Sequence, residues 1–420
     1  MKSIIILGGG IQQVPAVAAI REAGYRVIVV DRNPEAPAFA TADACLNLAA
    51  NDIQGISSWI LINKQHLKIS GIFTLTNQAV SAALIANTCG LPSLSARVVI
   101  AAENKLLMKR ALQAASLPSA RFVAVATLDE ALTAYKTLRS EGVTDAYVKV
   151  VDGFGGKGVV RVASVEALWR VFPELQQVSR FPELIIEESL SGDFIDVQGF
   201  FVDGMFFPAG NADSRFTNER PEFGKYNPVE DFNICPSQLD SSVVEDAYNL
   251  LEMACRALEL NWGPVGGDFV LTKRGLEIIE IGPRLHGPNG TLQMFPAALG
   301  IQPIQFLAQL VCGDVTDSSL LVPRRQQVAL CKVFVSDRTD ITRVGFAPPA
   351  LELEGVFASF NYFELGIANI QGEAMLTGVA SAFVQGENLA QAIARLARVE
   401  QAFFIECEGS SRLQINRKES

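Results

Sequence analysis

Apolar and polar stretches alternate along the first ninety residues in a way that predicts strands and helices in turn. Residues 3–7 form an apolar strand, Gly8–Gly10 a turn, and residues 12–23 a helix that ends at Gly24. A second apolar strand, 26–30, ends at Asp31, and further strands are predicted at 44–48 and 71–75. Strands that alternate with helices are typical of a doubly wound α/β unit.

The middle of the chain mixes both periodicities. Helices are predicted over 97–115, 128–140, 164–172, 241–259, 293–299 and 303–312. Strands are predicted over 121–125, 146–151, 159–162, 184–188, 194–202 and 205–209, with a hairpin at 265–281. Residues 211–237 show little periodicity and are predicted to be a long irregular loop, a feature that is often functional.

A last unit of alternating strands and one helix begins after Pro323. Strand-like runs occupy 328–335 and 377–384, a helix is predicted at 388–399, and a terminal strand at 402–406.

Glycines gather in one loop between two of these strands. Lys149 lies on the first strand, and glycines follow at 153, 155, 156 and 158 before the strand 159–162. Glycine lets backbone N–H groups approach phosphate oxygens closely, and a lysine on the preceding strand can reach the same oxygens. The alternative is a hairpin tip with a solvated lysine. The loop lacks the Gly-Lys-Ser/Thr that opens a helix in the Walker motif.

Two lysines, Lys105 and Lys109, lie four positions apart on one face of the helix predicted at 97–115. This spacing is typical of a solvated face.

Two acids are predicted to face each other across the hairpin at 265–281. Asp268 and Glu280 are equidistant from residue 274 in the turn, so antiparallel pairing places their side chains on the same face. Paired carboxylates in an apolar hairpin favour a divalent cation such as Mg²⁺. Arg284 follows just past the strand, where it can stabilise charge on a transferred phosphoryl group. The alternative is one acid at a solvated strand end.

Composition narrows the classes of protein. The 420 residues correspond to two to four structural units, and a hydrophobic content of 49% is typical of a globular protein. No apolar run reaches membrane-spanning length, and the first residues are predicted to be a strand that enters a turn and not a signal peptide. Seven scattered cysteines favour reduced thiols in the cytoplasm. A net charge of −10 argues against nucleic-acid binding, and two histidines argue against a histidine-rich metal site.

The turn Gly8–Gly10 with Asp31 also resembles a dinucleotide-binding fingerprint, although Gln13 stands where the third glycine is expected. An NAD(P)-dependent oxidoreductase that uses the N-terminal unit is therefore a competing hypothesis.

Taken in order, the motifs resemble the ATP-grasp superfamily of carboxylate–amine ligases, and most closely its L-amino-acid (dipeptide) ligase and carbamoyl-phosphate-synthase-like branch. The resemblance covers about residues 1–320. Its motifs are Lys105, Lys149 with its glycine loop, Glu187-Glu188-Ser189-Leu190-x-Gly192, Asp268, and Glu280-x-x-x-Arg284. The loop that ends at Glu230 to Pro236 is similar to the acid-to-proline stretch of that branch.

The resemblance implies a mixed α/β and α+β fold in four parts. A Rossmann-like pre-ATP-grasp domain (1–95) would precede ATP-grasp subdomains at 96–186 and 187–320, and a small C-terminal α+β domain would occupy 321–420.

The resemblance also implies a role for each matched residue. Lys105, Lys149 and the loop glycines Gly155, Gly156 and Gly158 would hold ATP phosphates. The hinge segment Glu187, Glu188 and Leu190 would hold adenine, and Asp193 or Asp196 the ribose. Asp268 and Glu280 would bind Mg²⁺, with Mn²⁺ as an alternative. Catalysis would involve Arg284, Lys149 and Glu280, and the substrates would contact Glu230, Arg284 and His286.

The implied activity is ATP-dependent joining of a carboxylate to an amine through an acyl phosphate, with amino-acid-type substrates, release of ADP and phosphate, and a homodimer. Gly282 stands where the family often has a metal-binding Asn. A non-catalytic nucleotide-binding homologue therefore remains a second alternative.

Overall fold

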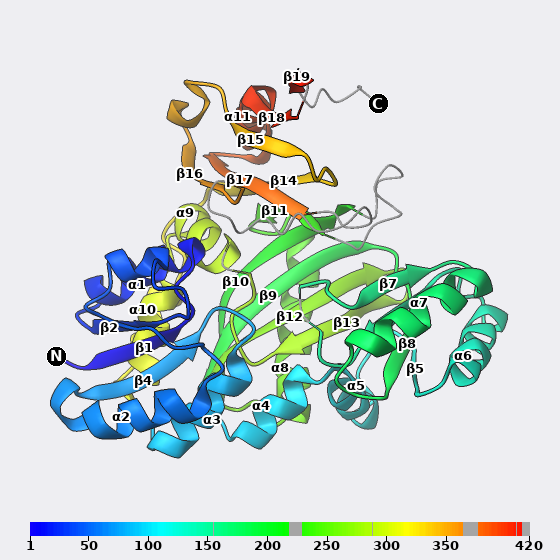
Figure 1. Ribbon diagram of the computed structural model, residues 1–420, viewed down its shortest axis with the longest axis horizontal. Helices are drawn as coiled ribbons and strands as arrows, with labels where there is room; N and C mark the ends of the chain where they lie inside the picture. Colours follow the sequence, from blue (N-terminus) through cyan, green and yellow to red (C-terminus); the bar gives the residue numbers. More distant parts are fainter. Residues whose placement is uncertain (154, 218–228, 288, 364–376, 409, 414–420) are drawn as a thin grey trace.

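The computed structural model describes the chain except for residues 154, 218–228, 288, 364–376, 409 and 414–420 (Figure 1). An N-terminal unit lies at the lower left of Figure 1, a small sheet with two helices at the right, and the C-terminal strands at the top. A large antiparallel sheet runs through the middle.

The N-terminal unit is a parallel sheet of order β3-β2-β1-β4. Its elements are β1 (Ser3–Leu7), η1 (Ile11–Gln13), α1 (Val14–Glu22), β2 (Arg26–Val30), η2 (Pro37–Ala40), β3 (Ala44–Leu46), α2 (Ile53–Leu67), β4 (Ile69–Thr74) and α3 (Ala79–Cys89). The side chains of β1 alternate between two clusters, one packed on α1 and α10 (Pro303–Val311) and the other on α2 and α3. Because both faces are covered, residues 4–7 of β1 are all apolar, as expected for a buried parallel strand.

A second unit follows, with an antiparallel sheet of order β5-β8-β6-β7. Its elements are α4 (Ala96–Glu103), α5 (Lys105–Ala114), β5 (Phe122–Val125), α6 (Leu128–Ser140), β6 (Ala146–Val150), β7 (Val159–Val162), α7 (Val165–Val178) and β8 (Leu184–Glu188). Helices α6 and α7 pack on one face of this sheet around Phe172 and Leu138.

The prediction of a single helix over 97–115 is wrong, because Asn104 divides it. The Asn104 side-chain oxygen accepts from the backbone N–H groups of Leu106 and Leu107, at 3.1 and 3.0 Å. Asparagine is a strong N-cap residue, so a new helix begins at Lys105.

The large sheet has the order β13-β12-β9-β10-β11-β14-β17-β16, and every neighbouring pair is antiparallel. Its first strands and their helix are β9 (Asp193–Val202), β10 (Met205–Phe216), β11 (Glu230–Cys235), α8 (Ser241–Ala257), β12 (Gly263–Thr272) and β13 (Gly275–Gly282). The π-helical turn η4 (Asn289–Met294) and helix α9 (Phe295–Leu299) follow, then α10 and η5 (Ser318–Leu321).

The remaining elements add strands to the same sheet and build a smaller one, of order β15-β18-β19. They are β14 (Val328–Ser336), β15 (Ile341–Phe346), η6 (Ala350–Glu352), β16 (Val356–Asn361), β17 (Thr377–Gly386), α11 (Leu389–Ala402), β18 (Phe403–Cys407) and β19 (Ser410–Leu413). Strand β14 pairs with β11, so the sheet runs without a break from the middle of the chain into its last hundred residues.

The predicted irregular loop at 211–237 is wrong at both ends. Strand β10 continues to Phe216 and β11 begins at Glu230, while residues 218–228 lie outside the described part of the chain. The apolar alternation is weak because Ser214 and Asn233 point into a cavity and Asp231 pairs with Lys332 in the interior, at 2.7 Å. Polar residues on a strand that lines a cavity hide the usual strand pattern.

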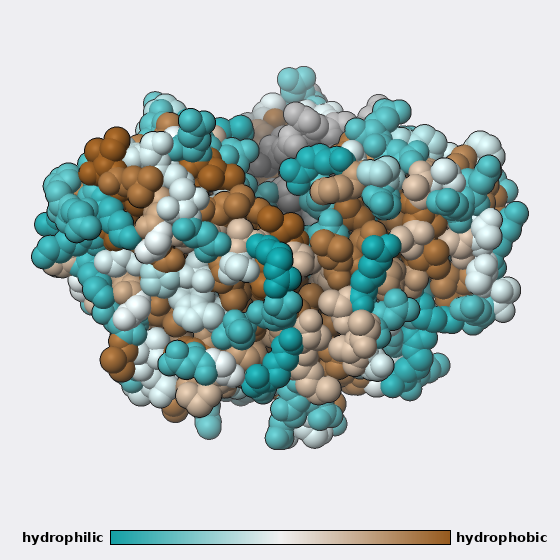
Figure 2. All heavy atoms as spheres, turned by 90° about the horizontal axis from the view of Figure 1, so that it is seen from below, coloured by the Kyte–Doolittle hydropathy of each residue, from teal (hydrophilic) through white to brown (hydrophobic). Residues whose placement is uncertain are grey.

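Seen from below, the surface mixes hydrophilic and hydrophobic residues (Figure 2). Among the helices of the described residues, none combines the length and the apolar character needed to cross a membrane.

Candidate nucleotide and metal site

A cavity of about 1230 Å³ opens where the N-terminal unit, the second unit and the large antiparallel sheet meet. The N-terminal unit contributes residues from its first turn and from the end of β4, including Gln12, Thr76 and Asn77. Fourteen of the residues predicted from the sequence line the cavity: Lys105, Lys149, Gly155, Gly156, Glu187, Glu188, Leu190, Asp193, Asp196, Glu230, Asp268, Glu280, Arg284 and His286. Residues separated by up to 181 positions in the sequence thus share one space.

The glycine loop joins β6 to β7, as predicted. Gly155, Gly156 and Gly158 have φ of 56°, 74° and 72°, values that favour glycine. Gly158 does not line the cavity. A Cβ there would lie 2.4 Å from a methyl group of Val150, so this glycine allows the loop to approach β6.

Both lysines expected to hold phosphates are paired with carboxylates. The Nζ atom of Lys105 lies 2.8 Å from Glu280 Oε2, and that of Lys149 lies 2.5 Å from Glu187 Oε1. Lys105 opens α5, where its backbone N–H donates to Val151 O at 2.8 Å and ties the helix to the strand of Lys149. The two ammonium groups therefore reach the cavity from neighbouring elements.

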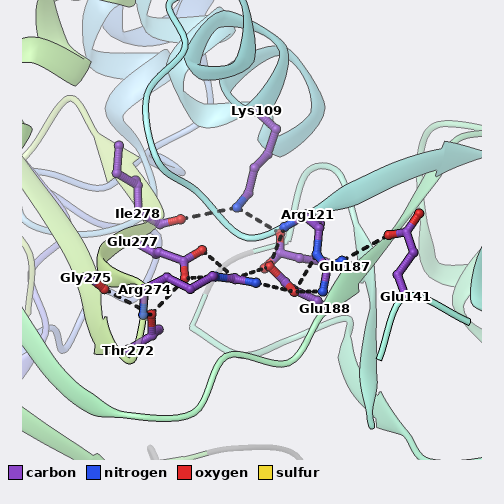
Figure 3. Close-up of polar contacts among 10 residues, drawn as sticks. All are labelled: Lys109, Arg121, Glu141, Glu187, Glu188, Thr272, Arg274, Gly275, Glu277 and Ile278. Atoms are coloured by element: carbon purple, nitrogen blue, oxygen red, sulfur yellow. Dashed lines mark hydrogen bonds and ion pairs between the residues drawn. The ribbon is translucent and has the colours of Figure 1, made fainter. Parts of the chain in front are cut away.

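Lys109 was expected on a solvated face, and this expectation is wrong. Its side chain is only 1% exposed, and its Nζ atom lies 3.1 Å from Glu187 Oε2 and 3.4 Å from Ile278 O (Figure 3). Burial lowers the pKa of Lys109 and outweighs the opposing effect of Glu187. A signal was available in the sequence, because Lys109 follows Met108 and precedes Leu112 by three positions, on the apolar side of the helix.

The predicted pair of facing acids is confirmed as a register pair, because Asp268 lies opposite Glu280. Thr272 pairs with Gly275 across a two-residue turn, so simple counting would place Ile279 opposite Asp268. A bulge after Asp268 shifts the register by one residue and brings Glu280 there instead.

The two facing acids have different surroundings. Burial favours protonation of Glu280, but Lys105 outweighs this effect and lowers the pKa of Glu280 to about 2. Asp268 is half exposed and faces His286, whose Nδ1 lies 3.5 Å from Asp268 Oδ1 and 3.2 Å from Asp196 Oδ2. One acid is thus held by a lysine and the other by an imidazole.

His286 sits between two glycines. A Cβ at Gly282 would lie 2.8 Å from its Nε2 atom, and a Cβ at Gly266 would lie 2.7 Å from its ring. Burial opposes a charge on the imidazole, but Asp268 and Asp196 outweigh it and raise the pKa of His286 to about 10. The imidazole fills the space that a side chain at position 282 would need.

Asp196, Asp268 and His286 have ligand atoms within 4.8 Å of one another, which is close enough to share a cation once that cation displaces the proton that the two acids favour on the imidazole. With Glu280 alongside, the donors are mostly carboxylate oxygens, which suit Mg²⁺ or Mn²⁺. Asp196 points toward this end of the cavity, so its side chain belongs with the acids and His286. Its Oδ1 also accepts from Gln198 Nε2 at 2.7 Å.

Arg284 follows β13 with a half-buried guanidinium group. Among the described residues its buried Nε has no hydrogen-bond partner, and Glu103 is 4.0 Å away. A buried donor without an acceptor is costly, which favours an anionic ligand at this position.

The acid of the dinucleotide-like turn is already engaged by its own unit. Asp31 accepts from the backbone N–H of Gly9 at 2.8 Å and of Asn33 at 2.8 Å. A Cβ at Gly9 would lie 2.9 Å from Val29 and 3.1 Å from Ala36, so the chain itself packs closely against this turn. The features that prompted the oxidoreductase hypothesis therefore serve the packing of the turn.

Comparison with known proteins agrees with this architecture. Residues 102–288 match the ATP-grasp domain family. Uncharacterised protein y4rH of Sinorhizobium fredii is 24% identical over 248 residues, which are 56% of this chain and 46% of that protein. The chain thus spans about half the length of this relative.

Two solved structures share the fold over nearly the whole chain. An L-amino acid ligase from Bacillus licheniformis has a TM-score of 0.79 at 18% identity, with 97% of this chain and 99% of that chain covered. The biotin carboxylase domain dimer of the Hydrogenobacter thermophilus 2-oxoglutarate carboxylase, solved with MgADP, ADP and bicarbonate, has a TM-score of 0.71 at 14% identity, covering 97% and 91%. The chain therefore carries an ATP-grasp domain at residues 102–288.

Proposed function

We propose that the protein is an ATP-dependent ligase that joins a carboxylate to an amine through an acyl phosphate and releases ADP and phosphate. One observation carries the proposal. A single cavity gathers two lysines, a glycine loop, a facing pair of acids and an arginine from two units of the chain. These are the groups that phosphoryl transfer requires, because its catalysis is mostly positioning and charge stabilisation.

The nucleotide would lie between the two sheets. Lys105, Lys149 and the backbone of the glycine loop would hold its phosphates, and the segment from Glu187 to Leu190 would hold adenine. Asp193 is the better candidate for the ribose, because it lines the cavity with an exposed side chain, whereas Asp196 is bonded to His286 and Gln198.

A divalent cation fits the acidic end of the cavity. Asp268 and Glu280 would hold it, and His286 would stand where the family's Asn ligand is missing. Bound Mg²⁺ would offset the charge of the phosphates. The fit is supported by the hard oxygen donors on facing positions of one hairpin.

The chemistry proceeds in two balanced steps. A carboxylate oxygen of the substrate attacks the γ-phosphorus of ATP, and the bond to the bridging oxygen of ADP breaks. The amine then attacks the acyl carbon, phosphate leaves, and the amine loses a proton. Arg284, with its unpaired Nε, would stabilise the negative charge that develops in both steps.

The substrates would enter beside the phosphates. Glu230 and His286 line the acidic end of the cavity, and Gln12, Thr76 and Asn77 line the side formed by the N-terminal unit. Carboxylates suit an ammonium group and amides suit a polar substrate, which supports amino-acid-type substrates. The TM-score of 0.79 with an L-amino acid ligase points in the same direction.

A phosphate-release screen over amino acids and small carboxylates, with Mg²⁺ and ATP, tests the proposal. We expect release with at least one carboxylate–amine pair, and loss of it in Arg284→Ala and Glu280→Ala variants that melt like the parent. Turnover that survives both substitutions would refute the site. Binding of MgATP without phosphate release from any pair would favour the non-catalytic alternative.

A further inference from the structure

Lys109 is a buried cation that does not reach the cavity. It lies on α5 with 1% of its side chain exposed, and it is absent from the residues that line the cavity. Its contacts are Glu187 Oε2 at 3.1 Å and Ile278 O at 3.4 Å (Figure 3). Because burying an ammonium group is costly, such a lysine needs a reason to be there.

Glu187 is shared between two lysines that differ in access. Lys149 binds Glu187 Oε1 at 2.5 Å and lines the cavity, whereas Lys109 binds Oε2 from the interior. The Glu187 side chain is itself 2% exposed, so water cannot replace a lost partner. Only Lys149 can therefore turn to a ligand, and only Lys109 can then stay with Glu187.

We propose that Lys109 is a positioning residue that keeps Glu187 neutralised while Lys149 leaves it to bind the phosphates of the nucleotide. This role rests on the proposed function, because it needs a polyphosphate in the cavity. A buried carboxylate that loses its last partner is strongly destabilised. Without Lys109, Lys149 would be held on Glu187, and nucleotide phosphates would compete for it at a disadvantage.

Binding measured by isothermal titration calorimetry with MgADP and with adenosine separates this role from simple packing. In Lys109→Met, we expect the Kd for MgADP to rise about tenfold or more, since a charge-assisted contact is lost, while that for adenosine changes less than about twofold. Arg110→Met is the matched control, because Arg110 is the exposed neighbour on the same helix. It should leave both constants unchanged.

The double variant Lys109→Met/Glu187→Gln sharpens the test. With no carboxylate to hold it, Lys149 is free again, and the MgADP affinity should return to that of Glu187→Gln alone. Equal losses for MgADP and adenosine in Lys109→Met, or no recovery in the double variant, would refute the role of Lys109 while leaving the proposed function intact. A parent protein that binds no MgADP would refute both.

A structure of the parent protein with MgADP tests the same idea without any substitution, should Lys109→Met fail to fold. We expect the Lys109–Glu187 contact to remain and the Lys149–Glu187 distance to exceed about 4 Å, the limit of an ion pair. Lys149 still seated on Glu187 beside bound phosphates would overturn the proposal.

Discussion

Glu187 and Glu188 are neighbours on β8, yet their side chains lie in two different environments. Glu187 is bound by two lysines, of which one is fully buried and the other faces the cavity. Glu188 is bound by two arginines, Arg121 and Arg274, whose side chains are 39% and 50% exposed (Figure 3). The strand alternation sends the two carboxylates to opposite faces.

The two pairs of cations have different geometry. The guanidinium of Arg274 reaches both oxygens of Glu188, at 2.5 Å from Oε1 and 3.3 Å from Oε2. Arg121 donates to Oε2 from its guanidinium, at 2.8 Å from Nε, and to Oε1 from its backbone N–H at 3.0 Å. Arg274 also holds Glu277, so the tip of the β12–β13 hairpin is fixed to β8. An arginine fork holds a carboxylate in one geometry, whereas a lysine is a point charge that can change partners. The comparison indicates that the Glu188 side of β8 keeps its arginine partners in place, whereas the Glu187 side can exchange one of its lysine partners. We call these two sides the holding face and the exchanging face.

The largest effect should come from removing the shared carboxylate of the exchanging face. Glu187→Ala leaves Lys109 buried without its partner and close to Lys149. We expect a loss of about 3–5 kcal/mol in the free energy of unfolding, the usual cost of breaking a buried pair. Urea denaturation would measure it. A loss below about 1 kcal/mol, as for exposed pairs, would show that Lys109 is not held in this way.

A smaller effect is expected on the holding face. Glu188→Ala releases Arg121 and Arg274, but their half-exposed side chains regain water, so we expect a loss of about 1–2 kcal/mol. The same urea experiment measures it beside Glu187→Ala. A loss equal to or greater than that of Glu187→Ala would break the comparison, because burial would then not distinguish the two faces.

The stability that Glu188 contributes on the holding face should also depend on pH. This effect is smaller, and the pKa of Glu188 fixes its direction. Burial alone would raise the pKa of Glu188, but hydrogen bonds from Arg274 and Arg121 outweigh it and lower the pKa below its ordinary value of 4.5. A carboxyl group with a lowered folded-state pKa stabilises the fold above its ordinary pKa and stops doing so as the pH falls through the folded-state value. The stability gap between the parent and Glu188→Gln should therefore be constant from pH 7 to about 5 and close below 4.5. A gap that widens on acidification would contradict the assignment.

The sequence predicts much of the site because its parts follow local rules. Lys149 and its glycine loop lie between two strands that are recognisable from their apolar runs, and the hairpin carrying Asp268 and Glu280 is symmetric about a short turn. The prediction of this pair nevertheless centred the turn on residue 274, whereas the turn consists of the two residues between Thr272 and Gly275. The bulge next to Asp268 shifts the register by one residue and so makes up the difference. Bulges have no reliable signature in a single sequence.

The remaining features depend on tertiary packing. Lys109 lies on the apolar side of α5, but the partners that its ammonium group meets depend on how α5 packs against β8 and β13. Arg274 meets Glu188 across 86 positions of sequence, so no local pattern links them. The strands in the predicted loop at 211–237 were missed because their polar residues face the cavity.

The smallest effect should come from a pair that is as short but fully at the surface. Arg97 Nη2 lies 2.6 Å from Glu259 Oε2, close to the 2.5 Å between Lys149 and Glu187, yet its partners are 71% and 60% exposed. We expect Arg97→Ala to change the free energy of unfolding by less than about 0.5 kcal/mol, because water replaces the lost contact. The urea experiment that compares Glu187 with Glu188 measures this variant as well. If Arg97→Ala cost as much as Glu188→Ala, distance rather than burial would govern these ion pairs, and the contrast between the two faces of β8 would lose its physical basis.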